Sequence, residues 1–403
     1  MSSPLRVLQI ITELAPAGAE SIVRTLAAGL AARGLHVRLV GLFDPPWPGP
    51  DIGHQLVRVG LDVTRLAMRH KLDLLRLIRL VRLVRQWQPH IIHAHLWHAD
   101  MASRLARLLA WPHRPIILST IHIAEHRRLP WRFALERLTQ SLCDAVACVS
   151  PSVMHFHRRR IGGRRSRRCV IPNGIDLSRF ARLPPRIQAR KTYCIPATCK
   201  AVGTVARLDV QKNIALLLEA FARLAGRFPD AVLLIAGRGP QEPILRARAH
   251  SLGIADRTHF VGFQPDPLPL LASLDVFVLP SRWEGFGLAT LEAMAAAVPV
   301  IVTDVIGSRD LVQPGRTGLL VPPDDAPALA SAIQQLWTNP QQAAALAKAA
   351  RRAARRYDQQ TMVRRYLQLY HELVSGPASR RRCFACDRPA RSVARHSGDQ
   401  PSY

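Results

Sequence analysis

The feature of this sequence that most constrains its fold is the alternation of short apolar runs with helical patterns along most of the chain. Runs typical of buried β-strands occupy the first part: LRVLQII, HVRLVGLF, HIIHAHLW, PIILSTIH and AVACVS. Similar runs occupy the second part: AVGTVARL, AVLLIAGRG, THFVGF, VFVLPS, PVIVTD and GLLVPP. Strands that alternate with helices are typical of a parallel sheet covered by helices on both faces. The sequence therefore predicts the α/β class.

A turn-rich interruption divides this alternation into two parts. Segment 171–200 concentrates prolines, together with Asn173 and Gly174, and we interpret it as a linker. A chain of 403 residues with 48% hydrophobic content can bury two ordinary cores, since domains usually hold about 100–200 residues. We therefore expect doubly wound domains at 1–183 and 184–356, a closing helix at 357–375 that packs back toward the first domain, and a basic disordered tail at 376–403.

Sheets of this kind bind ligands beyond the carboxyl ends of their strands. Two such sheets that face one another form a cleft with loops on both walls. The loops expected to line it are 12–20, 119–128, 206–213, 237–241 and 282–290.

The charge and the cysteines limit the possible partners and the compartment. The chain has 56 Lys and Arg against 28 Asp and Glu, and a net charge of +28 implies an anionic partner: nucleic acid, anionic lipid or a phosphorylated substrate. The 7 cysteines are scattered and suit reduced thiols. Only Cys383 and Cys386 form a CxxC pair, whereas a zinc ribbon needs two. No apolar run approaches the roughly 20 residues that span a bilayer, so we expect a cytoplasmic protein.

One segment, residues 284–304, has the pattern of an anion site: EGFGLATLEAMAAAVPVIVTD. A strand leads into a glycine-containing turn and then a helix, whose first unpaired N–H groups and dipole favour a phosphate. Gly285 and Gly287 let the backbone come close. Glu284 and Glu292 repel a phosphate but can accept hydrogen bonds from hydroxyl groups on either side of it, as a nucleotide sugar presents. The alternative is that acidic residues here only complement the helix dipole.

The same segment resembles the E-x7-E signature of the retaining glycosyltransferases of family 4, also called group 1 glycosyl transferases. Four further segments resemble the family in the same order: PAGAE (16–20), STIH (119–122), IPNGID (171–176) and VARLDVQKN (205–213). The resemblance covers about residues 5–375. It implies the GT-B architecture, in which two Rossmann-like domains face a cleft, the first on the acceptor side and the second binding the nucleotide sugar.

The resemblance also implies the site residues. Arg207 and Lys212 resemble the residues that bind the diphosphate and stabilise its charge as it leaves. Glu284 resembles the residue that orients the transferred sugar, and Glu292 the one that holds the ribose hydroxyls. His122 resembles the pocket histidine that bonds the donor sugar near the reacting carbon. The positions matching the family's backbone contacts to phosphate or sugar are Gly18, Phe286, Gly287, Leu288 and Ala289.

The chain departs from the family pattern at a few positions. Ala17 and Gly18 stand where the family often has two glycines. Arg238 stands where an acidic residue is usual, and Asp310 where Glu is usual.

The activity implied is transfer of a hexose from a nucleotide-diphosphate donor, a UDP-sugar, to an acceptor hydroxyl with retained anomeric configuration, in bacterial polysaccharide or glycolipid synthesis. No D-x-D occurs, and the helix start with Arg207 and Lys212 can replace a metal, so we expect neither metal nor cofactor. The alternatives are another GT-B-type enzyme, such as a nucleotide-sugar epimerase or a phosphorylase, and a basic nucleic-acid-binding protein. No recognised nucleic-acid module occurs, so no nucleic-acid partner is expected.

Two basic segments bear on the acceptor, which is a saccharide or is linked to a lipid. Residues 69–87 combine Leu and Ile with four arginines, and residues 157–168 are a second basic cluster. Both suit docking on an anionic membrane, which would place the protein at the inner face of the cell membrane. The alternative is that the helix packs its apolar side in the core and leaves the arginines in water.

Overall fold

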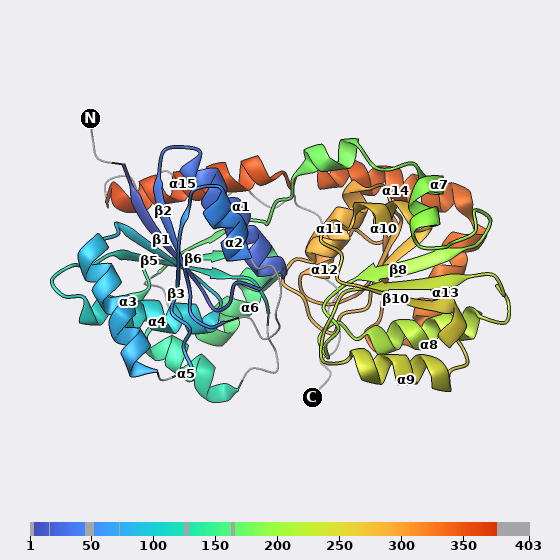
Figure 1. The fold of residues 1–403 in the computed structure, drawn as a ribbon, viewed down its shortest axis with the longest axis horizontal. Coiled ribbons are helices and arrows are strands. Elements are labelled where there is room, and N and C mark those ends of the chain that lie inside the picture. Colours follow the sequence, from blue (N-terminus) through green and yellow to red (C-terminus); the bar gives the residue numbers. More distant parts are fainter. Residues whose placement is uncertain are drawn as a thin grey trace.

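The computed structural model describes residues 4–15, 17–44, 52–71, 73–124, 129–162 and 166–376. In these ranges the strands form two parallel sheets, each in its own lobe, and the lobes lie side by side (Figure 1). The first sheet has the order β3-β2-β1-β4-β5-β6-β7 and the second β10-β9-β8-β11-β12-β13. This confirms the predicted pair of doubly wound α/β domains.

The strands of the first sheet are β1 (Arg6–Ile11), β2 (His36–Gly41), β3 (Asp62–Arg65), β4 (Ile91–His95), β5 (Ile116–Ile121), β6 (Ala145–Cys148) and β7 (Arg167–Val170). Those of the second are β8 (Ala201–Val205), β9 (Val232–Ala236), β10 (Thr258–Gly262), β11 (Val276–Leu279), β12 (Val300–Thr303) and β13 (Leu319–Val321). Every apolar run predicted to be a strand is one. The central strands are buried along their whole length because helices cover both faces.

The first lobe carries α1 (Gly18–Ala31), α2 (Ile52–Arg58), α3 (Leu74–Trp87), α4 (Trp97–Leu109), α5 (Pro130–Leu138) and α6 (Pro151–Ile161). The linker region contains the 3-10 helix η2 (Leu177–Ala181) and α7 (Arg186–Thr192). The second lobe carries α8 (Ile214–Leu224), α9 (Glu242–Ser251), α10 (Leu268–Ser273), α11 (Leu288–Ala295), α12 (Ser308–Leu311), α13 (Ala326–Thr338) and α14 (Pro340–Ala354), and α15 (Gln359–Val374) follows. Among the described residues, no helix is both long and apolar enough to cross a bilayer.

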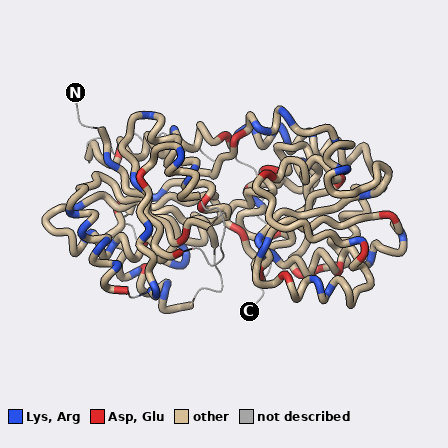
Figure 2. The backbone as a smooth tube through the Cα atoms, viewed as in Figure 1, with Lys and Arg blue, Asp and Glu red and all other residues tan. Residues whose placement is uncertain are grey.

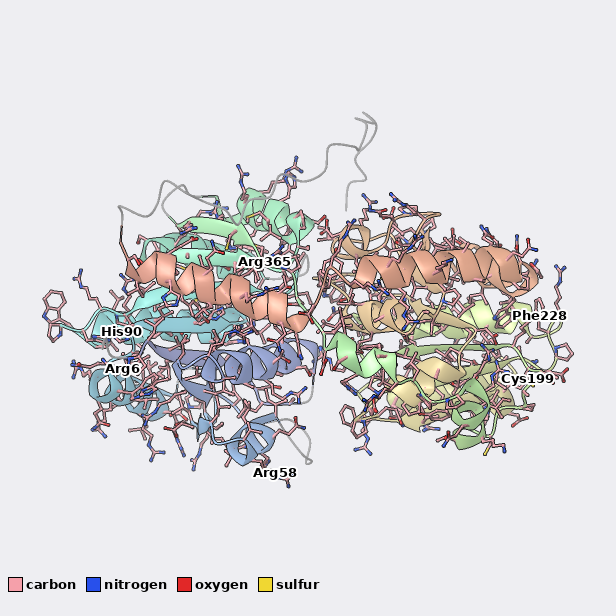
Figure 3. The ribbon with its side chains drawn as sticks, turned by 90° about the horizontal axis from the view of Figure 1, so that it is seen from above. Arg6, Arg58, His90, Cys199, Phe228 and Arg365 are labelled. Atoms are coloured by element: carbon pink, nitrogen blue, oxygen red, sulfur yellow. The ribbon has the colours of Figure 1, made fainter. Side chains whose placement is uncertain are left out.

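The carboxyl ends of the strands in both sheets point toward the junction between the lobes. Arg6 begins β1 and His90 directly precedes β4, and both residues lie at one end of the molecule (Figure 3). Cys199 and Phe228 precede β8 and β9 and lie at the opposite end (Figure 3). The loops that follow the strands therefore meet between the lobes, where ligands of such sheets bind.

The chain crosses between the lobes twice, along two neighbouring segments. Ile175 N–H donates to Tyr357 O and Gln359 N–H to Ile175 O, both at 2.9 Å. A Cβ at Gly174 would lie 2.6 Å from the backbone oxygen of Asp358, so glycine lets the segments touch. The predicted domain limits at 183/184 and 356/357 stay predictions.

Beyond this crossing, α15 lies over the first lobe, whereas α14 lies over the second (Figure 3). Helix α15 packs on α1, where a Cβ at Gly29 would lie 2.7 Å from a methyl carbon of Val363. Its Tyr366 and Tyr370 are fully buried in the core of the first lobe. The contact buries the apolar side of α15, as its amphipathic sequence predicts.

Some expectations need correction. Strands β3 and β7 were not predicted, because β3 is short and half-buried and β7 begins within the basic segment 157–168. That segment is not one exposed cluster: His157 is buried and lies 2.9 Å from Glu136 Oε1, while Arg167 pairs with Glu372 of α15. Helix α3 begins at Leu74, where Asp73 accepts a hydrogen bond from Arg76 N–H, so the segment 69–87 is helical only from Leu74 onward. The predicted tail, with Cys383 and Cys386, lies outside the described residues.

Candidate active site

The start of α11 is the centre of the candidate site. Strand β11 ends at Leu279, and the chain turns through residues 280–287 before the helix. Gly287 is the N-cap, with φ 78° and ψ 61°, a left-handed conformation that glycine adopts without strain. It has no side chain to cap the helix, so the first N–H groups are available to an anion. In the same turn, the hydroxyl of Thr290 is buried and has no partner among the described residues.

Glu284 and Lys212 form an ion pair beside this helix start. Lys212 Nζ lies 2.5 Å from Glu284 Oε1, and Ser281 Oγ donates to the same oxygen at 2.6 Å. The side chain of Lys212 is only 19% exposed and that of Glu284 only 6%. Both donors reach Oε1, so neither of them occupies Oε2. The predicted pair of charged groups is therefore brought together, with Ser281 as an added positioning partner.

Asp209 organises the loop that carries Arg207 and Lys212. Its carboxylate accepts from Arg207 Nε at 2.5 Å and from Lys212 N–H at 3.1 Å. The loop is fastened to the turn before α11, because Gln211 Nε2 donates to Trp283 O at 2.9 Å. Arg207 itself is 51% exposed, so its guanidinium reaches out of the loop.

The guanidinium of Arg207 faces carboxyl groups of the first lobe. Burial raises the pKa of Glu13, and the positive charge of Arg207 partly opposes that rise. Burial also raises the pKa of Glu20 to about 7. These carboxyl groups belong to the loop after β1 and to the first turn of α1, so opposite charges of the two lobes lie near one another here.

The first lobe touches the start of α11 at two further places. A Cβ at Gly285 would lie 1.7 Å from the carbonyl oxygen of His122, so these backbones are in direct contact across the junction. The close approach of Gly285 is thus to His122, where the sequence suggested a phosphate. Gly18, at the start of α1, faces the side chain of Leu288, 3.4 Å from where a Cβ would stand. Burial lowers the pKa of His122 to about 4, so its ring is neutral at pH 7.

Glu292 and Phe286 occupy the two flanks of the site. Burial raises the pKa of Glu292 to about 7, with the nearby charge of Arg179 opposing this rise. Arg179 also pairs with Asp266 at 2.7 Å. The ring of Phe286 is buried against Tyr357, with centroids 5.2 Å apart, so its side chain supports the crossing between the lobes. The backbone roles of Phe286, Leu288 and Ala289 stay predictions.

Comparison with known proteins identifies the family. Residues 16–179 match Glycosyltransferase Family 4, and residues 186–353 match Glycosyl transferases group 1. The chain is 31% identical to the glycogen synthase of Mycobacterium tuberculosis (strain ATCC 25618 / H37Rv) over 332 residues. The matched region covers 79% of this chain and 74% of that protein. The chain belongs to the group 1 glycosyltransferases of family 4. It is therefore an enzyme that transfers glycosyl groups.

Other proteins similar to this glycosyltransferase agree in activity or fold. The D-inositol 3-phosphate glycosyltransferase of Corynebacterium urealyticum is 30% identical, over 72% of this chain and 74% of that protein. The structure of Anabaena HepE with UDP and glucose superposes with a TM-score of 0.81 at 21% identity, covering 91% of this chain and 99% of that one. The structure of sucrose-phosphate synthase of Thermosynechococcus elongatus superposes with a TM-score of 0.77 at 26% identity, covering 92% of this chain and 99% of that one. These likenesses confirm the GT-B fold.

Of the two unusual positions in this glycosyltransferase, Arg238 adjoins the loop of Lys212, because its carbonyl oxygen accepts a hydrogen bond from Leu208 N–H at 2.9 Å. Arg238 is exposed on the loop after β9. Asp310 accepts hydrogen bonds from the backbone N–H and the hydroxyl of Ser152, both at 3.0 Å, and so ties α12 to the first turn of α6 across the junction.

Sequence reasoning missed several residues of this site. Asp209 lies inside the quoted VARLDVQKN segment, and Glu20 ends the PAGAE segment, but neither was given a role. Ser281 directly follows a buried strand, a position where polar side chains face a ligand edge. Arg179 lies just beyond IPNGID and left no signal in the sequence, because its proximity to Glu292 depends on how the lobes are joined.

Proposed function

We propose that this enzyme transfers a hexose from a UDP-sugar to an acceptor hydroxyl with retention of the anomeric configuration. The observation that carries the proposal is the pair of Lys212 and Glu284 at the open start of α11, with Arg207 on the same loop. Here a cation and a carboxylate lie beside a helix N-terminus, and the second cation, Arg207, belongs to the same loop as Lys212.

Each group has a task in this reaction. As the bond between sugar and diphosphate breaks, negative charge grows on the leaving oxygen, and Arg207, Lys212 and the first N–H groups of α11 stabilise it. Glu284, repelled by the phosphate, orients the transferred sugar through its hydroxyls. Glu292 accepts hydrogen bonds from the ribose. The departing phosphate oxygen accepts the proton of the acceptor hydroxyl on the same face of the sugar, which retains the configuration.

The names of relatives support the class of donor and acceptor. HepE binds UDP and glucose in its crystal structure, which favours a UDP-hexose donor here. Relatives include a glycogen synthase and a lipopolysaccharide core mannosyltransferase, LpsB of Rhizobium meliloti, which is 36% identical over 51% of this chain. We therefore infer a role in polysaccharide or glycolipid synthesis.

A basic groove on α6 suits an acceptor that carries anionic groups. It has a volume of about 660 Å³ and lies between α6 and Ile306 of the second lobe. The residues lining it are Pro151, Ser152, His155, Phe156, Arg159, Arg160 and Ile306. Arg159 and Arg160 are exposed, and no described carboxylate pairs with them. The groove is next to the contact of Ser152 with Asp310 and so belongs to the acceptor side of the junction.

The surface of α3 supports docking on an anionic membrane. Leu74 and Leu75 are 67% and 76% exposed, and Ile78 is 45% exposed. Figure 2 shows Lys and Arg recurring over the part of the first lobe that Figure 1 labels α3, α4 and α5. The rest of the helix instead packs its apolar side in the core and leaves its arginines in water, because Leu80 and Val84 are buried. The start of α3, apolar and flanked by arginines, is the part that suits lipid.

The proposal is tested by thermal stabilisation of the purified protein with a panel of nucleotide sugars, followed by transfer assays. We expect one UDP-hexose to raise the melting temperature and to release UDP only when an acceptor is present. Release of nucleotide without an acceptor would indicate another GT-B-type enzyme. We expect transfer to be unchanged by EDTA, and loss of activity with EDTA that returns with a divalent cation would contradict the metal-independent scheme.

A further inference from the structure

A series of buried hydrogen bonds runs from His122 into the core of the first lobe. His122 Nε2 lies 3.0 Å from His95 Nδ1, and His95 Nε2 lies 2.6 Å from Gln9 Oε1. Gln9 Nε2 donates to the hydroxyl of Tyr370 at 3.2 Å. Gln9, His95 and Tyr370 are completely buried. The series therefore joins the ring at the junction to the closing helix α15 through β1 and β4.

Beyond Tyr370 the series continues away from the junction. The Tyr370 hydroxyl lies 2.7 Å from His93 Nδ1, and His93 Nε2 lies 2.7 Å from Thr120 Oγ1. Thr120 Oγ1 lies 3.1 Å from the hydroxyl of Tyr366. Polar groups in an apolar core are costly unless they are paired, and here each atom of the series has a partner until His122.

The side-chain amide of Gln9 sets the direction of these bonds. Its oxygen only accepts, so His95 Nε2 carries the proton and donates to it. Burial and the neighbouring histidines hold the pKa of His95 well below its usual range, so its ring is neutral and its Nδ1 has the lone pair. His122 Nε2 must then donate to His95 Nδ1. Because His122 is neutral as well, its own lone pair is on Nδ1.

Nδ1 of His122 is the one atom of this series that ends without a partner. It is buried and has no hydrogen-bond partner among the described residues. An unpaired buried acceptor is costly, so a ligand that supplies a donor gains from meeting it. Nδ1 belongs to His122, whose backbone carbonyl oxygen touches Gly285. Gly285 directly follows Glu284, the residue proposed to orient the sugar.

We infer that Gln9, His95 and Tyr370 are positioning residues that fix the tautomer of His122, so that its Nδ1 accepts a hydrogen bond from a hydroxyl of the transferred sugar. Only the identity of the ligand rests on the proposed function. The tautomer itself is a property of the protein without donor. A closing helix that returns to the first lobe thus determines whether the junction presents an acceptor or a donor to the sugar.

Two matched substitutions on α15 separate this role from support of the core. Tyr370→Phe removes the hydroxyl that holds the Gln9 amide, so the amide can rotate, donate to His95 and reverse the direction of the bonds to His122. Tyr366→Phe removes an equally buried hydroxyl one turn away, beyond His93 and Thr120. Both variants lose one buried hydroxyl, so melting temperatures compare their effects on stability.

The first measurement needs no donor. In nitrogen-15 NMR spectra of the full chain labelled at histidine, the His122 signals are those missing from His122→Gln. We expect an unprotonated Nδ1 and a protonated Nε2 in the wild type and in Tyr366→Phe, and a mixture of tautomers in Tyr370→Phe. A proton on Nδ1 in the wild type, or an unchanged tautomer in Tyr370→Phe, would overturn the inference whatever the enzyme transfers.

The second measurement uses transfer kinetics. We expect kcat/KM for the donor to fall about three- to tenfold in Tyr370→Phe, the equivalent of one hydrogen bond. Tyr366→Phe should keep the wild-type value. Since Tyr370 acts through His122, the double variant His122→Phe/Tyr370→Phe should be no slower than His122→Phe alone. A further loss in the double variant would show that Tyr370 acts by another route and would refute its positioning role.

Discussion

The backbone of Gly285 lies against the carbonyl oxygen of His122, so that a Cβ at this glycine would stand 1.7 Å from that oxygen. The contact joins the turn before α11 to the loop after β5, and it is made between backbones, which cannot rotate away as a side chain can. The two lobes can therefore come together at the site only while residue 285 has no side chain.

Gly285→Ala should thus hold the lobes apart by the width of a methyl group. We expect kcat to fall at least tenfold, because misplacing reacting groups by about 1 Å is costly, while the melting temperature changes little. Gly226→Ala is the control, since a Cβ there meets nothing within 4 Å. Steady-state kinetics of both variants test this. Wild-type turnover in Gly285→Ala would show that the contact is not needed for transfer.

The ion pair of Lys212 and Glu284 makes stability and activity separable. Lys212→Met leaves a buried carboxylate without its cation, which should lower the free energy of unfolding by about 3–5 kcal/mol. The double variant Lys212→Met/Glu284→Gln, without either charge, should recover most of that stability. Urea denaturation measures both.

Activity should not recover with stability. In the proposed reaction Lys212 stabilises the leaving diphosphate, so we expect kcat to fall by about 10²–10³ in both variants. Arg248→Met is a matched control, because it breaks an exposed pair with Glu219 on the second lobe. Measurable transfer near the wild-type rate in the double variant would remove Lys212 and Glu284 from the reaction.

The fold could be predicted from the sequence because parallel strands buried on both faces leave continuous apolar runs, as in β9 and β11. The β7 strand could not, because it is a basic edge segment whose Arg167 finds its partner, Glu372, some two hundred positions away. Local patterns do not record such pairing.

The same contrast holds for the site. The Lys212 loop and the Glu284 turn were found, since each motif lies in one short segment. The network from Gln9 through His95 to Tyr370 was not, although HIIHAH shows alternate histidines on a strand. Its members come from three elements, and Tyr370 joins Gln9 and His95 only because α15 packs against the first lobe.

Glu292 gives a dependence of stability on pH. Burial raises its folded pKa to about 7 from an ordinary value of 4.5, so the folded protein holds a proton that the unfolded chain releases. This group's contribution to stability is therefore fully present below pH 4.5 and is lost as pH rises toward 7. Glu292→Gln, which is neutral at every pH, should melt higher than the wild type at pH 8 and similarly at pH 4.5.

The same substitution should weaken binding of the donor, because an amide accepts fewer hydrogen bonds from ribose than a carboxylate does. Thermal melts at both pH values, with and without UDP, measure the two effects. Glu219→Gln serves as the control for loss of a carboxylate on the surface. A variant that melts lower than the wild type at pH 8 would contradict the raised pKa of this half-buried carboxyl group.

The proposed docking on a membrane rests on the exposed part of α3. Two exposed arginines of this helix, Arg79 and Arg82, are not paired with any carboxylate of the described residues. Each should contribute about 1 kcal/mol to binding near an anionic surface. Arg79→Gln/Arg82→Gln should lower binding to anionic vesicles roughly 30-fold, and Leu75→Asn should lower it further by removing an apolar anchor that is 76% exposed. Ile187→Asn on α7, 64% exposed on the other lobe, should not. Sedimentation with anionic and neutral vesicles measures this, and equal binding by all variants would place the membrane contact elsewhere.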